Sequence, residues 1–321
     1  MIKQLWIRNF KSAKDLQINC KRVNIFIGEP NTGKSNILES LGLLSFGYYG
    51  GTGKLEEFVR HEEIVDLFSD RDIDESVEIS FDDEKVKIHF EDLQFKFVYS
   101  GKEEPKVFFV YNSTRTSLKE FERFKFYRFK TLRESERSEL GFLLPPSGCN
   151  LHTLLLAHRE LRSTAQNILE NFGLKLVLEP PQNKVKVLKL SDELIVLFPY
   201  AVISDTIQRV IFNLVAVRSN NNSVITLEEP EAHAFPFYAK FLAESIAIDE
   251  RNNQYFIATH NPYFLLPIME KTSKGDLAVF LTYLKDYQTK VKLLGDRELE
   301  EVLDRGIDVF FNVERFLEEE E

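Results

Sequence analysis

Apolar stretches and helical patterns alternate at both ends of the chain. The apolar stretch at 22–27 is rich in β-branched and aromatic residues. It comes before a segment in which Ile37, Leu38, Leu41 and Leu44 form one helical face. The expected elements are, in order, a strand at 22–27, a helix at 35–44, a helix at 206–217, a strand at 223–227, a helix at 235–248, a strand at 254–258 and a strand at 276–281. Strands that alternate with helices are typical of a parallel sheet, so we expect an α/β fold.

The middle of the chain has a different pattern. Residues 76–111 alternate between apolar and polar positions, which predicts a meander of antiparallel strands with one solvated face. Two helices are expected at 116–140 and 150–172, followed by three short strands within 174–198. Residues 1–27 begin with a predicted antiparallel hairpin, and glycines gather at 45–53.

These patterns predict two parts. Residues 1–52 and 199–321 are expected to form one nucleotide-binding domain with a mainly parallel sheet. Residues 53–198 are expected to form an inserted α+β lobe.

The most specific motif lies between the first parallel strand and its helix. Residues 28–35 read GEPNTGKS and match the P-loop pattern G-x-x-x-x-G-K-[ST]. The backbone N–H groups of such a loop surround nucleotide phosphates, and the following helix points its positive end at them. The alternative is a turn that binds no ligand, but such a turn requires neither Lys34 nor Ser35. We therefore predict a nucleotide site.

The residue types of this loop indicate their roles. Lys34 is expected to reach the outer phosphates, and Ser35 to hold Mg²⁺ through its hydroxyl. The predicted nucleotide-binding residues are Gly28, Glu29, Pro30, Asn31, Thr32, Gly33, Lys34, Ser35 and Asn36.

Acidic and polar residues follow the two later strands. Glu228 and Glu229 end the strand at 223–227, and adjacent strand residues point to opposite faces, so the two can have different roles. We expect Glu228 to support Mg²⁺ through water and Glu229 to orient or deprotonate the attacking water. His260 follows the next strand, and carboxyl ends of parallel strands share one edge, so it is expected to contact the γ-phosphate or the water. The alternatives are a solvated acidic turn and a structural histidine.

Composition limits the class of partner and compartment. The 321 residues carry a net charge of −10, so the overall field does not attract nucleic acid and only a local patch would. The segment 115–133 is such a patch, since basic and aromatic residues interleave there; we favour a packing role over nucleic-acid binding. With two cysteines and no apolar stretch long enough for a membrane, we expect a cytoplasmic protein.

The motifs together resemble the ABC-type ATPase heads of the SMC, DNA-repair and OLD families. The resemblance rests on the P-loop, on the segment LEEPEAH at 227–233, on ATHNP at 258–262 and on the N-terminal hairpin with NFKSAKDL at 9–16. It implies that two heads enclose two ATP molecules, and that a signature segment of one subunit closes the P-loop of the other.

The signature segment departs from the family pattern. The resemblance places Ser204 in trans against the γ-phosphate of the partner, but Thr206 stands where the family has glycine. Glu228 stands where the family usually has aspartate, and the longer side chain is expected to slow turnover.

The sequence therefore predicts an ATPase. We expect a P-loop NTP hydrolase that uses ATP and Mg²⁺, with Lys34, Glu229 and His260 as catalytic residues, Ser35 and Glu228 at the metal, and a homodimer in the ATP state. It would drive a partner process, DNA-related or defence-related, with an effector protein. The alternative is a nucleotide-operated clamp with little turnover that binds a protein or a nucleic acid.

Overall fold

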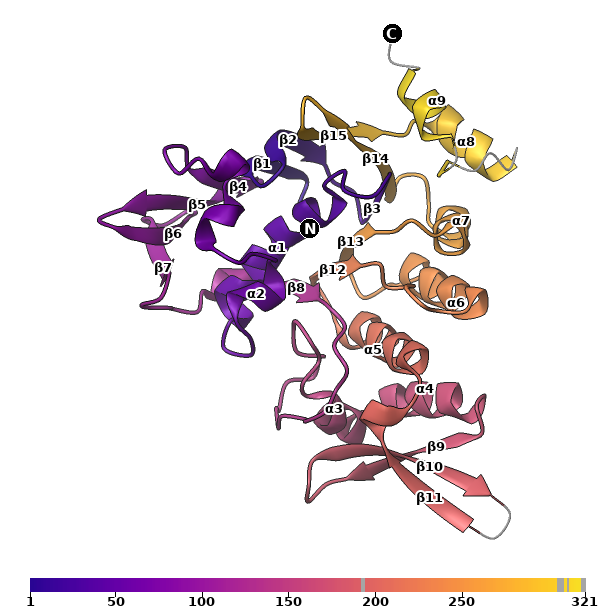
Figure 1. The fold of residues 1–321 in the computed structure, drawn as a ribbon. Helices are drawn as coiled ribbons and strands as arrows, with labels where there is room; N and C mark the ends of the chain where they lie inside the picture. Colours follow the sequence, from indigo (N-terminus) through magenta and orange to yellow (C-terminus); the bar gives the residue numbers. More distant parts are fainter. Residues whose placement is uncertain (192–193, 305–308, 311, 319–321) are drawn as a thin grey trace.

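A computed structural model describes residues 1–191, 194–304, 309–310 and 312–318 (Figure 1). Its central sheet has six strands in the order β15-β14-β3-β13-β12-β8. The strands are β3 (Val23–Ile27), β8 (Phe124–Tyr127), β12 (Val224–Glu228), β13 (Gln254–Ala258), β14 (Leu277–Lys285) and β15 (Gln288–Leu293). All neighbours are parallel except β14 and β15. The predicted α/β fold with a mainly parallel sheet is confirmed.

Helices cover both faces of this sheet because its strands are apolar on both sides. The five residues of β3 are all buried: Phe26 packs into one core, and Ile25 and Ile27 pack into the other. The first core contains α1 (Lys34–Tyr49). The second contains α5 (Asp205–Ser219), α6 (Pro236–Ala247) and α7 (Pro262–Lys271). In Figure 1, α1 lies on the left of the central strands and α5 to α7 lie on the right.

A second sheet packs on the other side of α1. Its order is β2-β1-β4-β5-β6-β7, and all its pairs are antiparallel. The strands are β1 (Gln4–Phe10), β2 (Ala13–Asn19), β4 (Val77–Phe81), β5 (Glu84–Glu91), β6 (Gln94–Ser100) and β7 (Lys106–Val110). The predicted N-terminal hairpin and the predicted meander thus join in one sheet.

A third sheet extends from the lower end of the molecule (Figure 1). It consists of β9 (Leu174–Glu179), β10 (Lys184–Ser191) and β11 (Leu194–Pro199), with β10 in the middle. The helices α3 (Leu151–Ala157) and α4 (Arg159–Glu170) join it to the body. The remaining helices are α2 (Leu55–Phe58), α8 (Asp296–Asp304), α9 (Val313–Glu318) and the 3₁₀ turns η1 (Ile64–Leu67), η2 (Ser69–Arg71), η3 (Lys119–Phe121) and η4 (Tyr200–Val202).

Two expected helices differ from the structure. The segment 116–140 is not a helix: it contains η3 and β8, then irregular chain. The segment 150–172 forms two helices that meet at His158. The inserted segment 53–198 also contributes β4 to β7 to the sheet of β1 and β2, and β8 to the central sheet. The division at residues 52 and 199 therefore stays a prediction.

Cys20 and Cys149 are free thiols and partly buried. Among the described residues, no helix combines the length and the apolar character that crossing a membrane requires. The final glutamates, 319–321, lie outside the described residues.

Candidate nucleotide-binding site

The P-loop connects β3 to α1, and its two glycines stand where no side chain fits. Gly28 has a φ of +140° and Gly33 a φ of +95°, which L side chains rarely adopt. A Cβ on Gly33 would lie 1.9 Å from Thr289 Oγ1, and one on Gly28 would lie 2.2 Å from the Thr282 carbonyl oxygen. The β14–β15 hairpin therefore supports the loop from behind and fixes its close curvature.

Hydroxyl groups tie this loop to both ends of the chain. Asn36 Nδ2 donates to Ser12 Oγ at 2.7 Å, and Ser12 Oγ lies 2.6 Å from Thr289 Oγ1. Thr32 Oγ1 lies 3.3 Å from Thr282 Oγ1. The turn between β1 and β2, the start of α1 and the β14–β15 hairpin thus meet at the predicted phosphate cradle.

Lys34 lies inside the loop, with 9% of its surface exposed. Its ammonium donates to the carbonyl oxygens of Gly28 at 2.8 Å and Glu29 at 2.6 Å. Burial lowers the pKa of Lys34, while the carboxylates of Glu229 and Glu29 oppose that shift. The arrangement keeps a cation in the loop, where a nucleotide would place its phosphates.

The strand ends bring the predicted catalytic residues to one edge of the central sheet. The Glu229 N–H donates to the Ala258 carbonyl at 2.9 Å, and the Thr259 N–H donates to the Phe26 carbonyl at 3.1 Å. These ladder bonds align the carboxyl ends of β12, β13 and β3. Glu229 Oε1 then lies 3.1 Å from Nδ1 of His260. A carboxylate and an imidazole in contact form a pair that can accept a proton from water.

The turn after β12 contains strained backbone. Glu229 has a φ of +43° and His233 a φ of +61°, values that are uncommon outside glycine. Such backbone persists where surrounding contacts fix it, and it is frequent at functional turns. Here the β12 and β13 ladder fixes Glu229.

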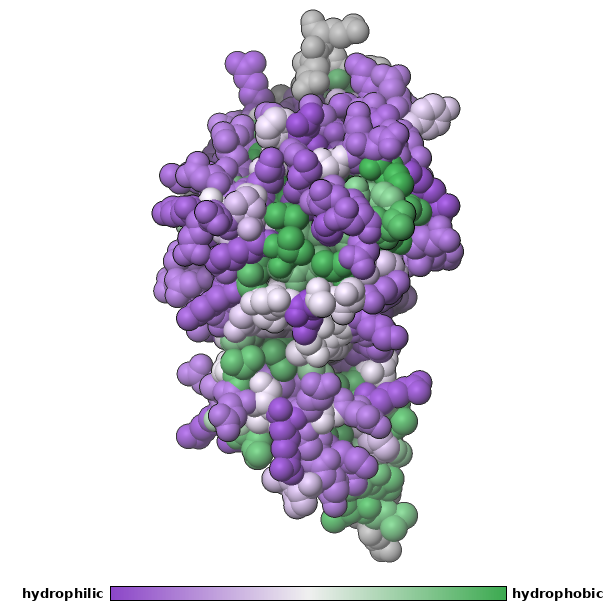
Figure 2. Space-filling model, turned by 90° about the vertical axis from the view of Figure 1, so that its left-hand side faces the viewer, coloured by the Kyte–Doolittle hydropathy of each residue, from purple (hydrophilic) through white to green (hydrophobic). Residues whose placement is uncertain are grey.

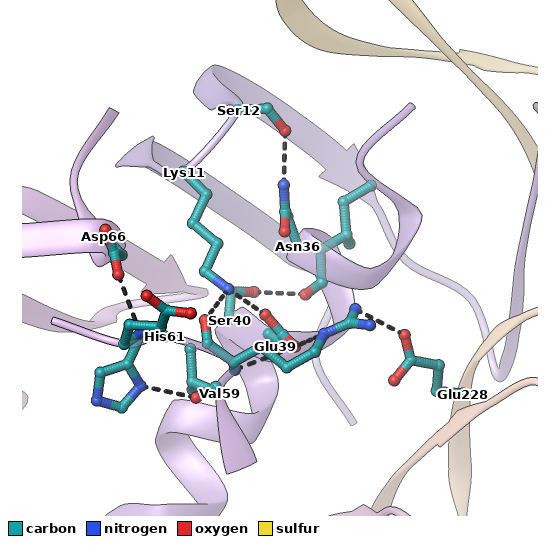
Figure 3. Close-up of polar contacts among 12 residues, drawn as sticks. Lys11, Ser12, Asn36, Glu39, Ser40, Val59, His61, Asp66 and Glu228 are labelled. Carbon is teal, nitrogen blue, oxygen red and sulfur yellow. Dashed lines mark hydrogen bonds and ion pairs between the residues drawn. The ribbon is translucent and has the colours of Figure 1, made fainter. Parts of the chain in front are cut away.

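Glu228 ends β12 as expected, but both of its oxygens are bound to arginines. Oε1 accepts from Arg60 Nη2 at 2.9 Å, and Oε2 accepts from Arg128 Nη2 at 3.3 Å. Figure 3 shows Glu228 reached by a guanidinium that also bonds toward Glu39 of α1. The predicted metal-side carboxylate is thus part of an ion cluster.

The residues predicted at the metal suit magnesium. Ser35 and Glu228 offer oxygen donors, which hard cations prefer. In the part of the chain that the structure describes, no group of three His, Cys, Asp or Glu side chains could hold a metal ion by itself. Mg²⁺ usually keeps several waters and binds one or two protein groups together with substrate phosphates, so a donor set of this kind fits it.

Ser204 lies at the start of α5 and is exposed. Thr206, in the glycine position of the signature, donates its hydroxyl to the His233 carbonyl at 2.8 Å. The signature helix is therefore joined to the turn that carries Glu229. Contact between Ser204 and a nucleotide on another subunit stays a prediction.

The aromatic residues of segment 115–133 lie mainly in the core. Phe121, Phe124, Phe126 and Tyr127 are at most 1% exposed. Arg123 lies over the ring of Phe124. The favoured packing role therefore agrees with the burial of this segment.

Several residues of the site received no role from the sequence motifs. Thr282 and Thr289 behind the loop, Glu39, Arg60 and Arg128 around Glu228, and Glu231 beneath the strand ends were not predicted. A sequence signal existed for Glu39, because it is the one charged residue of α1 after Lys34. For the arginines there was none, because Arg60 and Arg128 reach Glu228 from segments 168 and 100 residues away.

Residues 1–141 match the family model of an AAA ATPase domain. Among curated proteins, the DNA replication and repair protein RecF of Clostridium tetani (strain Massachusetts / E88) is 38% identical over 63 residues. That match spans 19% of this chain and 17% of the RecF protein.

Two solved structures share the fold over nearly the whole chain. An SMC head bound to the C-terminal winged-helix domain of ScpA has a TM-score of 0.54 at 14% identity, over 94% of this chain and 99% of that chain. An Smc head domain with an extended coiled coil, bound to the C-terminal domain of ScpA derived from Pyrococcus furiosus, has a TM-score of 0.51 at 12% identity, over 95% and 98%.

The two solved structures show that the chain has the fold of an SMC head, as the motifs predict, and the family match adds that residues 1–141 resemble an AAA ATPase domain. The expectation of a P-loop NTP hydrolase agrees with this match, since the matched domain is an ATPase domain.

Proposed function

We propose that the chain is an ABC-type ATPase head that binds ATP with Mg²⁺ in the P-loop and hydrolyses it, and that two copies enclose the nucleotides. The observation that carries the proposal is the contact between Glu229 and His260, 3.1 Å apart, at the strand edge that also bears the P-loop. Glu229 is close enough to Lys34 to affect its pKa, so a cation, a base and an imidazole share one site.

Each residue has a definite role in this proposal. The loop amides and Lys34 bind phosphates, and their positive charge stabilises the charge that develops on them. Ser35 and Glu228 would hold Mg²⁺, which shields the phosphate charge when it is bound. Glu229 accepts the proton of the attacking water, and His260 orients Glu229 or contacts the γ-phosphate.

We further propose that Ser204 of one copy completes the site of the other. Ser204 is exposed and precedes the 15-residue helix α5, whose N-terminus favours an anion. Dimerisation would then depend on ATP.

The process served is proposed as DNA-related. The 63-residue similarity to a protein named for DNA replication and repair supports it, and so does the fold of SMC heads. Those heads were solved with a ScpA domain, which supports a protein partner here also. A defence role of the OLD type, with an effector, is a further proposal. The two free cysteines agree with a reducing compartment such as the cytoplasm.

The variant Glu229→Gln tests the catalytic assignment. Because the amide cannot accept the proton, we expect ATP hydrolysis to fall by about 100-fold or more while ATP still binds. An ATP-bound dimer should then accumulate, as measured by light scattering after size-exclusion chromatography.

Glu250→Gln is the matched control, since Glu250 is exposed and precedes the amino end of β13, whereas His260 follows its carboxyl end. Its hydrolysis and oligomeric state should equal those of the unmodified protein. Wild-type turnover by Glu229→Gln would refute the role of Glu229 as base.

A nucleotide-operated clamp with little turnover is the second candidate. Two observations favour it: Thr206 replaces the signature glycine, and arginines hold both oxygens of Glu228. A steady-state ATPase assay with and without DNA separates the two candidates. Turnover supports the hydrolase, whereas an ATP-dependent dimer without turnover supports the clamp.

A further inference from the structure

A fully buried carboxylate lies behind the predicted metal position. Glu39, in the second turn of α1, has 0% of its surface exposed. Its Oε2 binds the Lys11 ammonium, and its Oε1 accepts from Arg60 Nε at 2.7 Å and Arg128 Nη2 at 2.9 Å. Figure 3 shows Lys11 and Glu39 pointing toward one another.

The same two arginines reach the end of β12. Arg60 uses Nε for Glu39 and Nη2 for Glu228, and Arg128 uses Nη2 for both carboxylates. Each arginine therefore bridges the buried carboxylate and the predicted metal carboxylate. The cluster contains three cations, Lys11, Arg60 and Arg128, against two anions, Glu39 and Glu228.

Glu39 is charged in this cluster. Burial alone would raise the pKa of its carboxyl, but Lys11, Arg60 and Arg128 together hold that pKa below its usual value. A buried carboxylate with three cationic partners is a fixed anchor, because breaking one pair would leave an uncompensated buried charge. Glu228 is the partly exposed member, at 17% for its side chain, and is the one free to turn.

We propose that Glu39, Arg60 and Arg128 are positioning residues for Glu228, and that they set how readily Glu228 serves a metal ion. The inference rests on the proposed function, since it assigns the cluster to the same site. A divalent cation and a guanidinium compete for the same carboxylate oxygens. Glu39 retains the arginines when Glu228 turns away from them.

The proposal predicts opposite changes in metal affinity when an arginine of the cluster and when Glu39 is replaced. Removing Arg128 frees Glu228 Oε2, so the metal should bind more tightly. Neutralising Glu39 leaves both arginines with Glu228 as their remaining carboxylate partner in the cluster, so the metal should bind more weakly. A purely structural cluster would instead change stability and leave metal dependence unaltered.

The experiment measures the affinity of the full chain for mant-ADP in EDTA and in saturating Mg²⁺. The affinity in Mg²⁺ divided by the affinity in EDTA reports the contribution of the metal. This ratio cancels any effect of a variant on nucleotide binding that does not involve the metal. For Arg128→Met we expect the ratio to rise by about tenfold, the size of one charge-assisted hydrogen bond. For Glu39→Gln it should fall by a similar factor, and the double variant should return toward the unmodified value.

Two further variants keep the test decisive. Lys130→Met is the matched control, because Lys130 lies two residues from Arg128 and pairs with Glu57 at 3.1 Å instead. Arg60→Met should also raise the ratio, and because the Arg60 side chain is 56% exposed, this variant serves as the second test if Glu39→Gln does not fold. An unchanged ratio in Arg128→Met and Arg60→Met overturns the inference. Absence of mant-ADP binding to the unmodified protein in both conditions overturns the proposed function instead.

Discussion

Glu231 is an ionisable side chain buried beneath the strand ends, with 2% of its surface exposed. Its Oε1 accepts from the Thr259 hydroxyl at 2.5 Å, whereas Oε2 has no hydrogen-bond partner among the described residues. Burial raises the pKa of its carboxyl to about 7, and the nearby charge of Glu229 adds to that shift. The protonated acid is therefore the form that suits this position.

The raised pKa predicts a pH dependence of stability. Between pH 4.5 and about 7 the folded chain keeps a proton on Glu231 that the unfolded chain releases, so stability falls as pH rises through that window. Glu231→Gln should remove this loss, which amounts to about 3 kcal/mol for a shift of this size. The variant should match the unmodified protein near pH 4.5 and exceed it near pH 8.

Urea unfolding at the two pH values measures this effect. The exposed Glu250→Gln is again the control, with the same difference from the unmodified protein at both pH values. A constant difference for Glu231→Gln as well would refute the buried-acid explanation.

For single residues, the sequence predicts chemical roles but not the side chains that each residue contacts. Lys34, Glu229 and His260 follow from motifs, and the structure brings them to one edge of the sheet. The partners of Glu228 depend on how α1, the chain after α2 and the chain after β8 pack together. No local pattern encodes such long-range packing.

At the scale of elements, periodicity identifies the strands and helices of the nucleotide-binding part. The strand β13 has the predicted bounds, and β12 and α6 differ by one residue at their ends. The failure at 116–140 has a physical cause. The strand β8 has only four residues, and a pattern that short does not distinguish a strand from part of a helix.

The strand β11 is an edge of its sheet and exposes apolar side chains. Leu194 is 69% exposed and Ile195 70%. Figure 2 shows apolar side chains at the lower end of the molecule, beside the grey residues. No charged residue or internal proline interrupts β11, so its free backbone groups can pair with another chain.

We predict that Ile195→Lys reduces concentration-dependent association. A charge on an exposed edge disfavours pairing, and the free energy of unfolding should change by no more than about 0.5 kcal/mol. Light scattering over a concentration series and urea unfolding measure the two quantities. Val107→Lys, on the edge strand β7 of the other large sheet, is the control; an equal effect there would show that added charge alone is responsible.

At the scale of the whole molecule, the nucleotide site joins segments from both ends of the chain. Ser12 and Thr289, 277 residues apart, are in contact behind the P-loop. A ligand held there should stabilise the entire fold, by about 2.7 kcal/mol at a concentration 100 times its Kd.

Gly33→Ala should abolish that stabilisation. The new Cβ would fall 1.9 Å from Thr289 Oγ1 at a φ of +95°, so the loop must distort. Thermal unfolding with and without ATP measures how much the nucleotide stabilises each variant. Gly275→Ala is the control, because a Cβ there meets nothing within 4 Å; an undiminished gain in Gly33→Ala would contradict the assigned cradle.

The central position of β3 also governs the order of events during protein synthesis. Its neighbours in the sheet are β13 and β14, and their partner residues lie more than two hundred positions later in the chain. When only the first hundred residues have left the ribosome, the nascent chain contains the P-loop sequence but not the strands that pack beside it in the folded protein. Nucleotide capture must therefore wait until the ribosome has also released β13 and the β14–β15 hairpin, which pack against β3 and the P-loop.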